Sequence, residues 1–228
     1  MSSDGADTGR RTRSVHGRRR IEDDPQFEEG LVAWFRDNYG SASFHDIYAR
    51  FSFGDGKLDA LIRKMIWKTG AHSCGPGLQV GSQAGFRHIE TFDIGANVFI
   101  GTGAYLQGRF DGICVIGNNV WIGPHAYFDA RNLMLGDHVG WGPGAKVLGS
   151  QHTGMPISEP IIATDLEVKP VRVGSGADIG TNATILPGIT IGEGAIIGAG
   201  AVVTTDIPAY AIAAGVPARV LRWRRDAV

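Results

Sequence analysis

One histidine lies where a regular sequence pattern is interrupted, and it is the residue best placed to do chemistry. His152 belongs to the run GSQHTG at 149–154, which ends one repeat unit just before the irregular stretch 155–170. Histidine is the side chain best matched to accept a proton near neutral pH, so we predict that His152 is a general base. A lone histidine can also be purely structural, and spacing alone leaves both roles open.

The interrupted pattern is an aliphatic residue at every sixth position. A period of six fits neither an amphipathic helix nor an alternating strand, and it is typical of a parallel β-helix. Each unit supplies one short strand and a corner, and the glycine that often follows the aliphatic is expected to let the chain turn tightly. The pattern returns between residues 94 and 147 with interruptions. Its regular series is Val173, Ile179, Ile185, Ile191, Ile197 and Val203.

Two amphipathic segments precede the repeats, at residues 25–39 and 57–68. Stacked repeats need a cap at an open end, so we predict that these helices cover the first coil. Membrane-surface docking is an alternative, because basic residues border the second apolar stripe. The predicted segments are a disordered basic tail at 1–24, a helical region at 25–70, the β-helix at 71–208 with a loop at 153–170, and a C-terminal segment at 209–228 with a short helix.

Composition limits the classes of function. The net charge of −1 indicates no polyanionic partner, and the arginines of residues 10–20 have no interleaved aromatics, which favours a solvated tail over a nucleic-acid arm. The two cysteines, Cys74 and Cys114, match no metal-binding spacing. No apolar run reaches eighteen residues free of glycine and charge. We therefore expect a soluble, cytoplasmic protein.

The segment from Gly149 to Arg222 resembles the hexapeptide-repeat acyltransferases, most closely the branch of galactoside, maltose and surface-polysaccharide acetyltransferases. The matching pieces are the histidine after a coil, ILPGITIG at 185–192, IGAGAVVT at 197–204, DIP at 206–208 and AAGVPAR at 213–219. The resemblance implies an all-β solenoid, a left-handed parallel β-helix. It also implies a homotrimer with acetyl-CoA in the groove between neighbouring prisms.

The resemblance further implies a direct reaction, in which the histidine matching His152 deprotonates an acceptor hydroxyl or amine that then attacks the thioester. Neither cysteine is needed as a nucleophile, and Cys114 is expected to be a packed, inert thiol. The cofactor contacts implied by the resemblance are Thr181 and Ala199 along the pantetheine arm, Thr204 and Thr205 beside the lower arm and phosphates, and Arg219 and Arg222 near the adenosine phosphates.

The acceptor site is less well matched by the family pattern. Asp178 replaces a tryptophan that sugar-acetylating members often carry, and the acceptor-binding asparagine one coil before the histidine has no clear counterpart. Stepping back one coil of about eighteen residues from His152 gives the candidates His125, Asp129, Arg131 and Asn132, which as corner residues could also be ordinary turn formers. The loop acids Glu159 and Asp165 are candidates to orient the imidazole.

We therefore predict an acetyl-CoA-dependent O-acetyltransferase acting on a saccharide, such as a surface polysaccharide or its precursor. N-acetylation of a nucleotide-linked amino sugar is the alternative within the same class. Two other classes share the solenoid: a γ-type carbonic anhydrase and a non-catalytic trimeric scaffold. The carbonic anhydrase needs two histidines a few residues apart, whereas His125, His138 and His152 are thirteen and fourteen residues apart, so no metal is expected.

Overall fold

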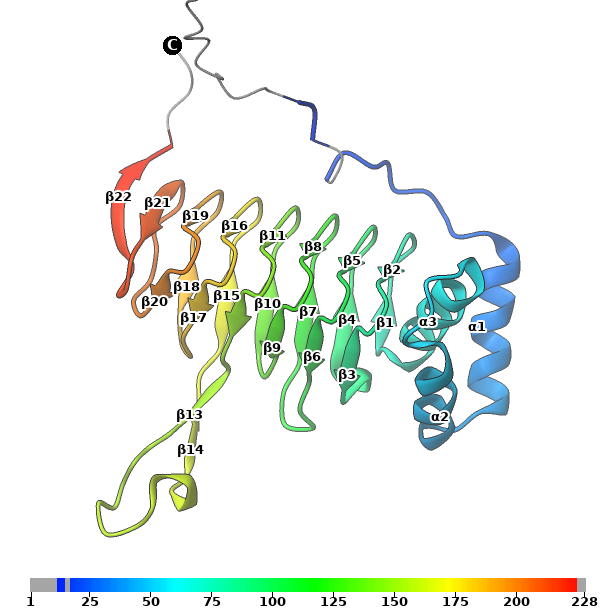
Figure 1. Cartoon of the computed structure of the whole chain (residues 1–228), viewed down its shortest axis with the longest axis horizontal. Helices are drawn as coiled ribbons and strands as arrows, with labels where there is room; N and C mark the ends of the chain where they lie inside the picture. The colour runs from blue at the N-terminus through cyan, green and yellow to red at the C-terminus, as the bar shows by residue number, and fades with distance from the viewer. Residues whose placement is uncertain (1–11, 15–16, 225–228) are drawn as a thin grey trace, which may run out of the picture.

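The computed structural model of the chain describes residues 12–14 and 17–224. Three helices come first: α1 (Gln26–Asn38), α2 (Ser41–Phe51) and α3 (Lys57–Gly70). A column of short strands follows, and Figure 1 shows it running away from the helices with one hairpin projecting from its side. No helix in the described part of the chain combines the length and hydropathy that a membrane span requires.

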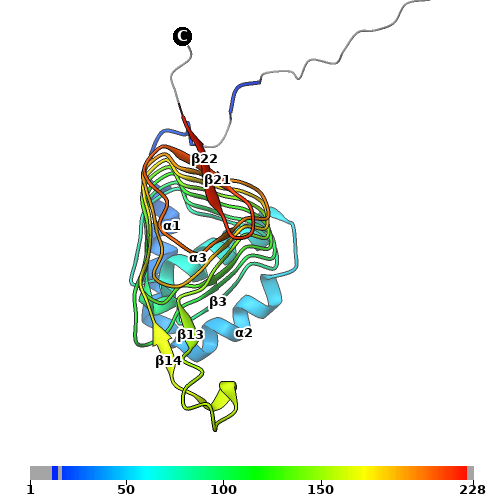
Figure 2. The same cartoon turned by 90° about the vertical axis from the view of Figure 1, so that its left-hand side faces the viewer.

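The column is three-sided, and each side is a sheet of parallel strands except for the last strand of one side (Figure 2). Face A contains β1 (Ser73–Cys74), β4 (Phe92–Ile94), β7 (Cys114–Ile116), β10 (Leu133–Leu135), β15 (Val171–Val173) and β18 (Thr190–Ile191). Face B contains β2 (Gln79–Val80), β5 (Phe99–Ile100), β8 (Trp121–Ile122), β11 (Gly140–Trp141), β16 (Asp178–Ile179), β19 (Ile196–Ile197), β21 (Ala211–Ala214) and β22 (Arg219–Trp223). Face C contains β3 (Gly85–Arg87), β6 (Tyr105–Gln107), β9 (Tyr127–Asp129), β12 (Lys146–Val147), β17 (Thr184–Ile185) and β20 (Val202–Val203).

One strand from each face makes a coil, so six coils are complete: β1–β3, β4–β6, β7–β9, β10–β12, β15–β17 and β18–β20. The sixfold period therefore predicts the fold correctly. The aliphatics of the regular series all point into the prism, with exposed fractions between 0% and 3%. Their burial holds neighbouring coils together, because a single coil cannot bury an apolar face by itself.

The glycine after each inward aliphatic has a different role from the predicted one. Gly180 does not adopt a left-handed backbone conformation, which occurs instead two residues further on, at Asn182 (φ 57°). A Cβ on Gly180 would lie 2.5 Å from the backbone nitrogen of Ala199 in the next coil. Glycine is therefore required for the close approach of two coils, and the tight turn is made at the asparagine.

The three edges of the prism differ in the length of their connections. Every connection from face A to face B, and from face B to face C, has four residues. The edge that joins face C to face A, here called the C–A edge, carries all the irregular ones. These include the six-residue loop 108–113 and the segment 148–170, which contains β13 (Ser150–His152) and β14 (Leu166–Val168). Both insertions project from the same edge of the column.

Helices α2 and α3 cover the first coil, as predicted for the segment 57–68, whereas α1 packs on α3 and α2 lies outside the two predicted amphipathic segments. Ile66 and Trp67 of α3 are fully buried and belong to the same hydrophobic core as Leu78 of the first coil. Trp67 Nε1 donates to the Tyr48 hydroxyl at 3.0 Å, and Tyr48 in turn donates to the Ala84 carbonyl at 2.5 Å. Ile66 and Trp67 of α3 thus pack on the solenoid, whereas Met65 packs against α1.

The short C-terminal helix predicted for residues 209–228 is wrong. The chain forms β21, which continues face B, and then turns back as β22, which pairs antiparallel with β21. The free edge of β21 explains the strand, because backbone hydrogen bonding to an exposed sheet edge outweighs the helix propensity of arginine and leucine.

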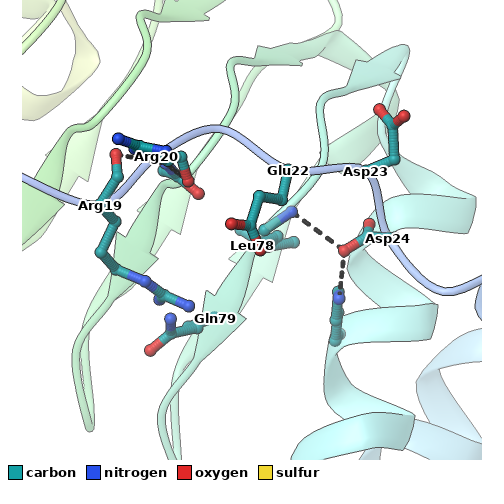
Figure 3. A pocket seen from close by; sticks show the side chains of 10 residues that line it. Arg19, Arg20, Glu22, Asp23, Asp24, Leu78 and Gln79 are labelled. Atoms are coloured by element: carbon teal, nitrogen blue, oxygen red, sulfur yellow. Dashed lines mark hydrogen bonds and ion pairs between the residues drawn. The ribbon is translucent and has the colours of Figure 1, made fainter.

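The N-terminal segment is tied to the first coils in its described part. The predicted disordered tail falls partly on residues 1–11 and 15–16, which lie outside the described residues. Asn97 donates to the carbonyls of Arg19 and Arg20 at 3.2 and 3.1 Å. Asp24, whose side chain is 4% exposed, accepts from Lys64 at 2.6 Å and from the Gly77 N–H at 3.0 Å (Figure 3). It also accepts from Lys68.

The buried contacts of Asp24 with Lys64, Lys68 and Gly77 lead to a prediction about stability. Burial opposes the charged form, but the hydrogen bonds from Lys64, Lys68 and Gly77 outweigh it and hold the pKa of Asp24 below its ordinary value of 3.8. Asp24→Asn is expected to lower the free energy of unfolding by about 2–3 kcal/mol at pH 7, measured by urea denaturation, because the lysines lose a buried partner.

The lowered pKa also fixes the pH dependence of this effect. The stabilisation is present above 3.8 and is lost as the pH falls through the folded-state pKa, so the difference between the two proteins should shrink below pH 3.8. Asp23→Asn, at an exposed neighbour, is the matched control and should change stability by less than about 0.5 kcal/mol. An equal loss in both variants would contradict the prediction.

Candidate active site

The predicted general base lies at the base of the projecting hairpin. β13 pairs antiparallel with β14, with Ser150 opposite Val168 and His152 opposite Leu166. Two further backbone bonds extend the ribbon, from Lys169 N to the Gly149 carbonyl at 3.1 Å and from Thr153 N to the Asp165 carbonyl at 2.8 Å. The hairpin therefore holds His152 on an ordered strand at the C–A edge.

The hydrogen bond of the imidazole fixes its tautomer. His152 Nδ1 lies 2.9 Å from the main-chain carbonyl oxygen of Thr164. A carbonyl oxygen can only accept, so Nδ1 must carry the proton and donate it. In the neutral ring Nε2 then has a free lone pair, and the side chain is exposed to solvent. This is the arrangement that a general base requires.

The residue that orients His152 is one that sequence reasoning missed. Glu159 and Asp165 form no hydrogen bond to the imidazole, and the partner is the Thr164 backbone. Thr164 is 6% exposed; its hydroxyl donates to the Ile161 carbonyl at 2.7 Å and accepts from Gly154 N at 3.1 Å. The acceptor is a main-chain carbonyl that the pairing of the hairpin strands brings to the imidazole. Every residue has such a carbonyl, so no sequence pattern marks this one.

The C–A edge one coil before the hairpin is polar and tightly connected. Asp129 Oδ2 accepts from the Ser150 hydroxyl at 3.0 Å, two residues before His152. Arg131 Nε lies 3.4 Å from Asp111 Oδ1. Asp129 and Arg131 are only 7% and 4% exposed, whereas Asn132 is half-buried in a left-handed turn. Asp129 and Arg131 thus support the base of the hairpin from the preceding coil.

The remaining predicted acceptor residue lies elsewhere. His125 occupies the turn between β8 and β9, on the edge that joins face B to face C, here called the B–C edge, with a φ of 57°. His138 occupies a turn between faces A and B. The three histidines of the carbonic anhydrase alternative therefore lie on three different edges. In the described residues no group of three or more histidine, cysteine or acidic side chains is placed to hold a metal ion.

The predicted cofactor residues divide between two edges and the last strand. Thr181 and Ala199 are exposed in the B–C turns of successive coils, joined by a bond from Gly200 N to the Thr181 carbonyl at 2.8 Å. Thr204 and Thr205 follow β20 at the C–A edge. Arg219 and Arg222 are exposed on β22. Within one chain, face C separates the B–C group from His152.

Neither cysteine has the character of a nucleophile. Cys114 is fully buried in face A, and burial raises the pKa of its thiol. Burial also raises the pKa of the Cys74 thiol, to about 11. Both thiols are therefore protonated at neutral pH, and the expectation that Cys114 is a packed thiol is confirmed.

Fold and sequence together define the class of protein. The family described as bacterial transferase hexapeptide (six repeats) matches residues 170–205, within the regular coils. The chain belongs to the hexapeptide-repeat acyltransferase family. A curated relative, Nodulation protein L of Rhizobium meliloti (strain 1021), is 40% identical over 129 residues, which cover 53% of this chain and 68% of that protein.

Solved structures share the fold. A single-site variant of AntD, an N-acyltransferase from Bacillus cereus in complex with dTDP and coenzyme A, superposes with a TM-score of 0.65 at 21% identity, over 76% of this chain and 91% of that chain. Galactoside acetyltransferase in complex with coenzyme A gives a TM-score of 0.54 at 23% identity, over 90% and 86%. A hexapeptide-repeat acetyltransferase from Vibrio cholerae O1 biovar eltor, complexed with acetyl coenzyme A, gives 0.52 at 20% identity, over 87% and 89%.

Proposed function

We propose that the protein transfers an acetyl group from acetyl-CoA to a hydroxyl of a saccharide, with His152 as the general base. The observation that carries the proposal is the Nδ1–H bond to the Thr164 carbonyl, which leaves Nε2 free to accept a proton. The fold neighbours crystallised with coenzyme A or acetyl coenzyme A support the choice of donor.

The reaction follows from the lone pair on Nε2. Nε2 removes the proton of the acceptor hydroxyl as its oxygen attacks the thioester carbonyl carbon. The tetrahedral intermediate collapses, the carbon–sulfur bond breaks, and the thiolate takes the proton from the imidazolium. The products are the O-acetyl ester and free CoA, with no acyl-enzyme. The Nδ1–H bond to a carbonyl dipole stabilises the imidazolium that forms in between.

A second copy of the chain would complete the site. His152 lies at the C–A edge, whereas Thr181 and Ala199 lie at the B–C edge of the same prism. If a symmetric ring of three copies places the C–A edge of each beside the B–C edge of the next, one groove receives both groups. We propose that acetyl-CoA occupies this groove, with the exposed guanidinium groups of Arg219 and Arg222 available to the phosphates.

The experiment that tests the proposal is release of CoA thiol from acetyl-CoA by the full chain. A panel of neutral and charged saccharides is compared with matched amino sugars, and the product is identified as ester or amide by its lability to hydroxylamine. We expect turnover of hydroxyl acceptors. Activity confined to amines would instead support N-acetylation of a nucleotide-linked amino sugar, the reaction type suggested by AntD. No thiol release with any acceptor would favour the scaffold alternative.

Thr164→Val tests the positioning of the imidazole. The change removes the hydroxyl that holds the loop through Gly154 and Ile161 while retaining the carbonyl that accepts from His152. We expect kcat to fall about tenfold, because the loss of two part-buried hydrogen bonds loosens the carbonyl that holds the imidazole, with the KM for acetyl-CoA unchanged and the melting temperature lowered by only a few degrees. Thr153→Val, at an exposed site, is the control, and equal kcat values for the two variants would contradict the prediction.

A further inference from the structure

The loop 108–113 is the second insertion at the C–A edge, and it has a defined conformation. Gly112 N donates to the Arg109 carbonyl at 3.2 Å, which closes a turn with Phe110 at its tip. Asp111 pairs with Arg131, and Leu133 N donates to the Ile113 carbonyl at 3.1 Å. The loop that leaves β6 and the β13–β14 hairpin descend on the same side of the column in Figure 1. The loop is therefore a built feature of the edge that carries His152.

An aromatic ring is held in solvent at the tip of this loop. The Phe110 side chain is 82% exposed, yet its ring is in an edge-on contact with the His88 ring, with centroids 6.2 Å apart. His88 is itself fixed by Glu90, 3.0 Å from Nδ1. An exposed aromatic that is held in place loses little entropy on binding and offers an apolar face to a ligand ring.

Two arginines adjoin this loop without an acidic partner: Arg109 directly precedes Phe110, and the Arg87 carbonyl accepts from Gly108 N at 2.8 Å. The acids of the edge lie beside other groups: Glu90 beside His88, Asp111 beside Arg131, and Asp129 beside Ser150, from which it accepts through Oδ2 while its buried Oδ1 has no partner in the described structure. In contrast, within the described residues neither Arg87 nor Arg109 is within 4.0 Å of a carboxylate oxygen. When the amide oxygen of Gln107 faces Arg109, it accepts from Arg109 Nη2 at 3.2 Å and from Arg109 Nε at 3.3 Å.

Register places these groups in line with the general base. Arg87, Gln107 and Asp129 are paired in successive strands of face C, and Asp129 binds Ser150 at the start of β13. Strands in a sheet are about 4.8 Å apart, so Arg109 lies roughly 10 Å along the axis from the coil that carries the hairpin. This separation is comparable to the length of a disaccharide.

We propose that Arg87, Arg109 and Phe110 form a subsite for an anionic group of the acceptor, either a carboxylate or a phosphate. The forked guanidinium donors match both anions, and the Phe110 ring packs against the sugar that bears the charge. The hydroxyl to be acetylated then lies about two coils away, at His152. The assignment rests on the proposed function, because it names the class of acceptor used by that site.

The test is equilibrium binding to the full chain saturated with CoA, measured by titration calorimetry. Three probes are matched: a neutral glucose disaccharide, its glucuronate counterpart and a glucose disaccharide phosphate. We expect the two anionic probes to bind about ten- to a hundredfold more tightly than the neutral one, and the stronger of them identifies the anion. Arg109→Gln, and more fully the Arg87→Gln, Arg109→Gln pair, should abolish this preference.

Arg172→Gln is the matched control, since Arg172 is an exposed arginine on the outer side of face A. Arg172→Gln should retain the tighter binding of the anionic probes, and so should the wild type when all titrations are made at one ionic strength. Phe110→Ala should weaken the binding of all three probes together. Equal affinity of the neutral and anionic probes in the wild type, absence of binding by both anionic probes, or an unchanged preference in the double variant would overturn the subsite.

The calorimetric result is separate from the test of the proposed function. If the charge preference is absent but thiol release still depends on His152, the subsite is rejected and the acetyltransferase proposal stands. A charge preference that responds to Arg109, in a protein whose His152→Ala variant turns over normally, would retain the subsite and remove the catalytic assignment.

Discussion

His152→Ala is expected to reduce kcat for CoA thiol release by about 10²–10⁴, the usual range for loss of a general base. The side chain is exposed, and its one hydrogen bond in the described structure is from Nδ1 to the Thr164 carbonyl, so the change removes the proton acceptor without opening a cavity. KM for acetyl-CoA should be nearly unchanged, because the imidazole contributes to the transition state and not to cofactor binding. Steady-state kinetics with a saccharide acceptor measure both parameters.

Two variants distinguish loss of chemistry from loss of structure. His138→Asn replaces an exposed histidine on another edge by a residue that tolerates its left-handed conformation (φ 58°), and kcat should stay within about twofold of the wild type. His152→Ala itself should melt within about 2 °C of the wild type. A decrease in kcat of less than threefold would remove His152 from the mechanism.

Trp141→Ala is expected to cause the largest loss of stability, about 3–5 kcal/mol in the free energy of unfolding. Trp141 is fully buried on the inner side of β11, and its ring meets the Phe128 ring edge-on with centroids 4.8 Å apart. Its Nε1 donates to the Ala145 carbonyl at 3.1 Å, which would lose a buried partner. Urea denaturation at one fixed protein concentration measures the change, because an oligomer unfolds in a concentration-dependent way.

Trp223→Ala removes the same side chain from an exposed position on β22 and is the matched control. It should change the free energy of unfolding by less than about 1 kcal/mol, since little apolar area is buried there. Similar losses in the two variants would mean that the interior of the fourth coil does not hold the solenoid together.

The repeat was readable because the inward position of each strand admits only an apolar side chain. Ile179 and Ile185 are fully buried, so the sequence must repeat apolar residues wherever a strand faces the interior. The terminal strand shows the limit of this reasoning. Arg222 and Trp223 are exposed on β22, and no buried pattern distinguishes a strand there from a helix. The outcome depends on the free edge of β21, which only the assembled sheet provides.

The site residues also differ in whether the repeat pattern marks them. His152 is the predicted general base because it directly precedes a break in the repeat, and breaks in a solenoid project from one edge. The candidates one coil earlier were not resolved by spacing. A count of eighteen residues does not distinguish the B–C turn of His125 from the C–A position of Asp129, and it does not reveal that Asp129 is buried beneath Ser150.

The sequence by itself determined the three-sided column, its helical cap and the histidine at its broken edge, because each is encoded by residues that recur at a fixed period or interrupt it. Only the tertiary structure decided how the imidazole is held. The Thr164 carbonyl reaches Nδ1 through the register of the β13–β14 hairpin, and the stacking of coils pairs Gln107 with Asp129, which accepts from Ser150 at the base of that hairpin. Backbone carbonyls and contacts between coils have no residue type of their own, so only folding brings them to the site.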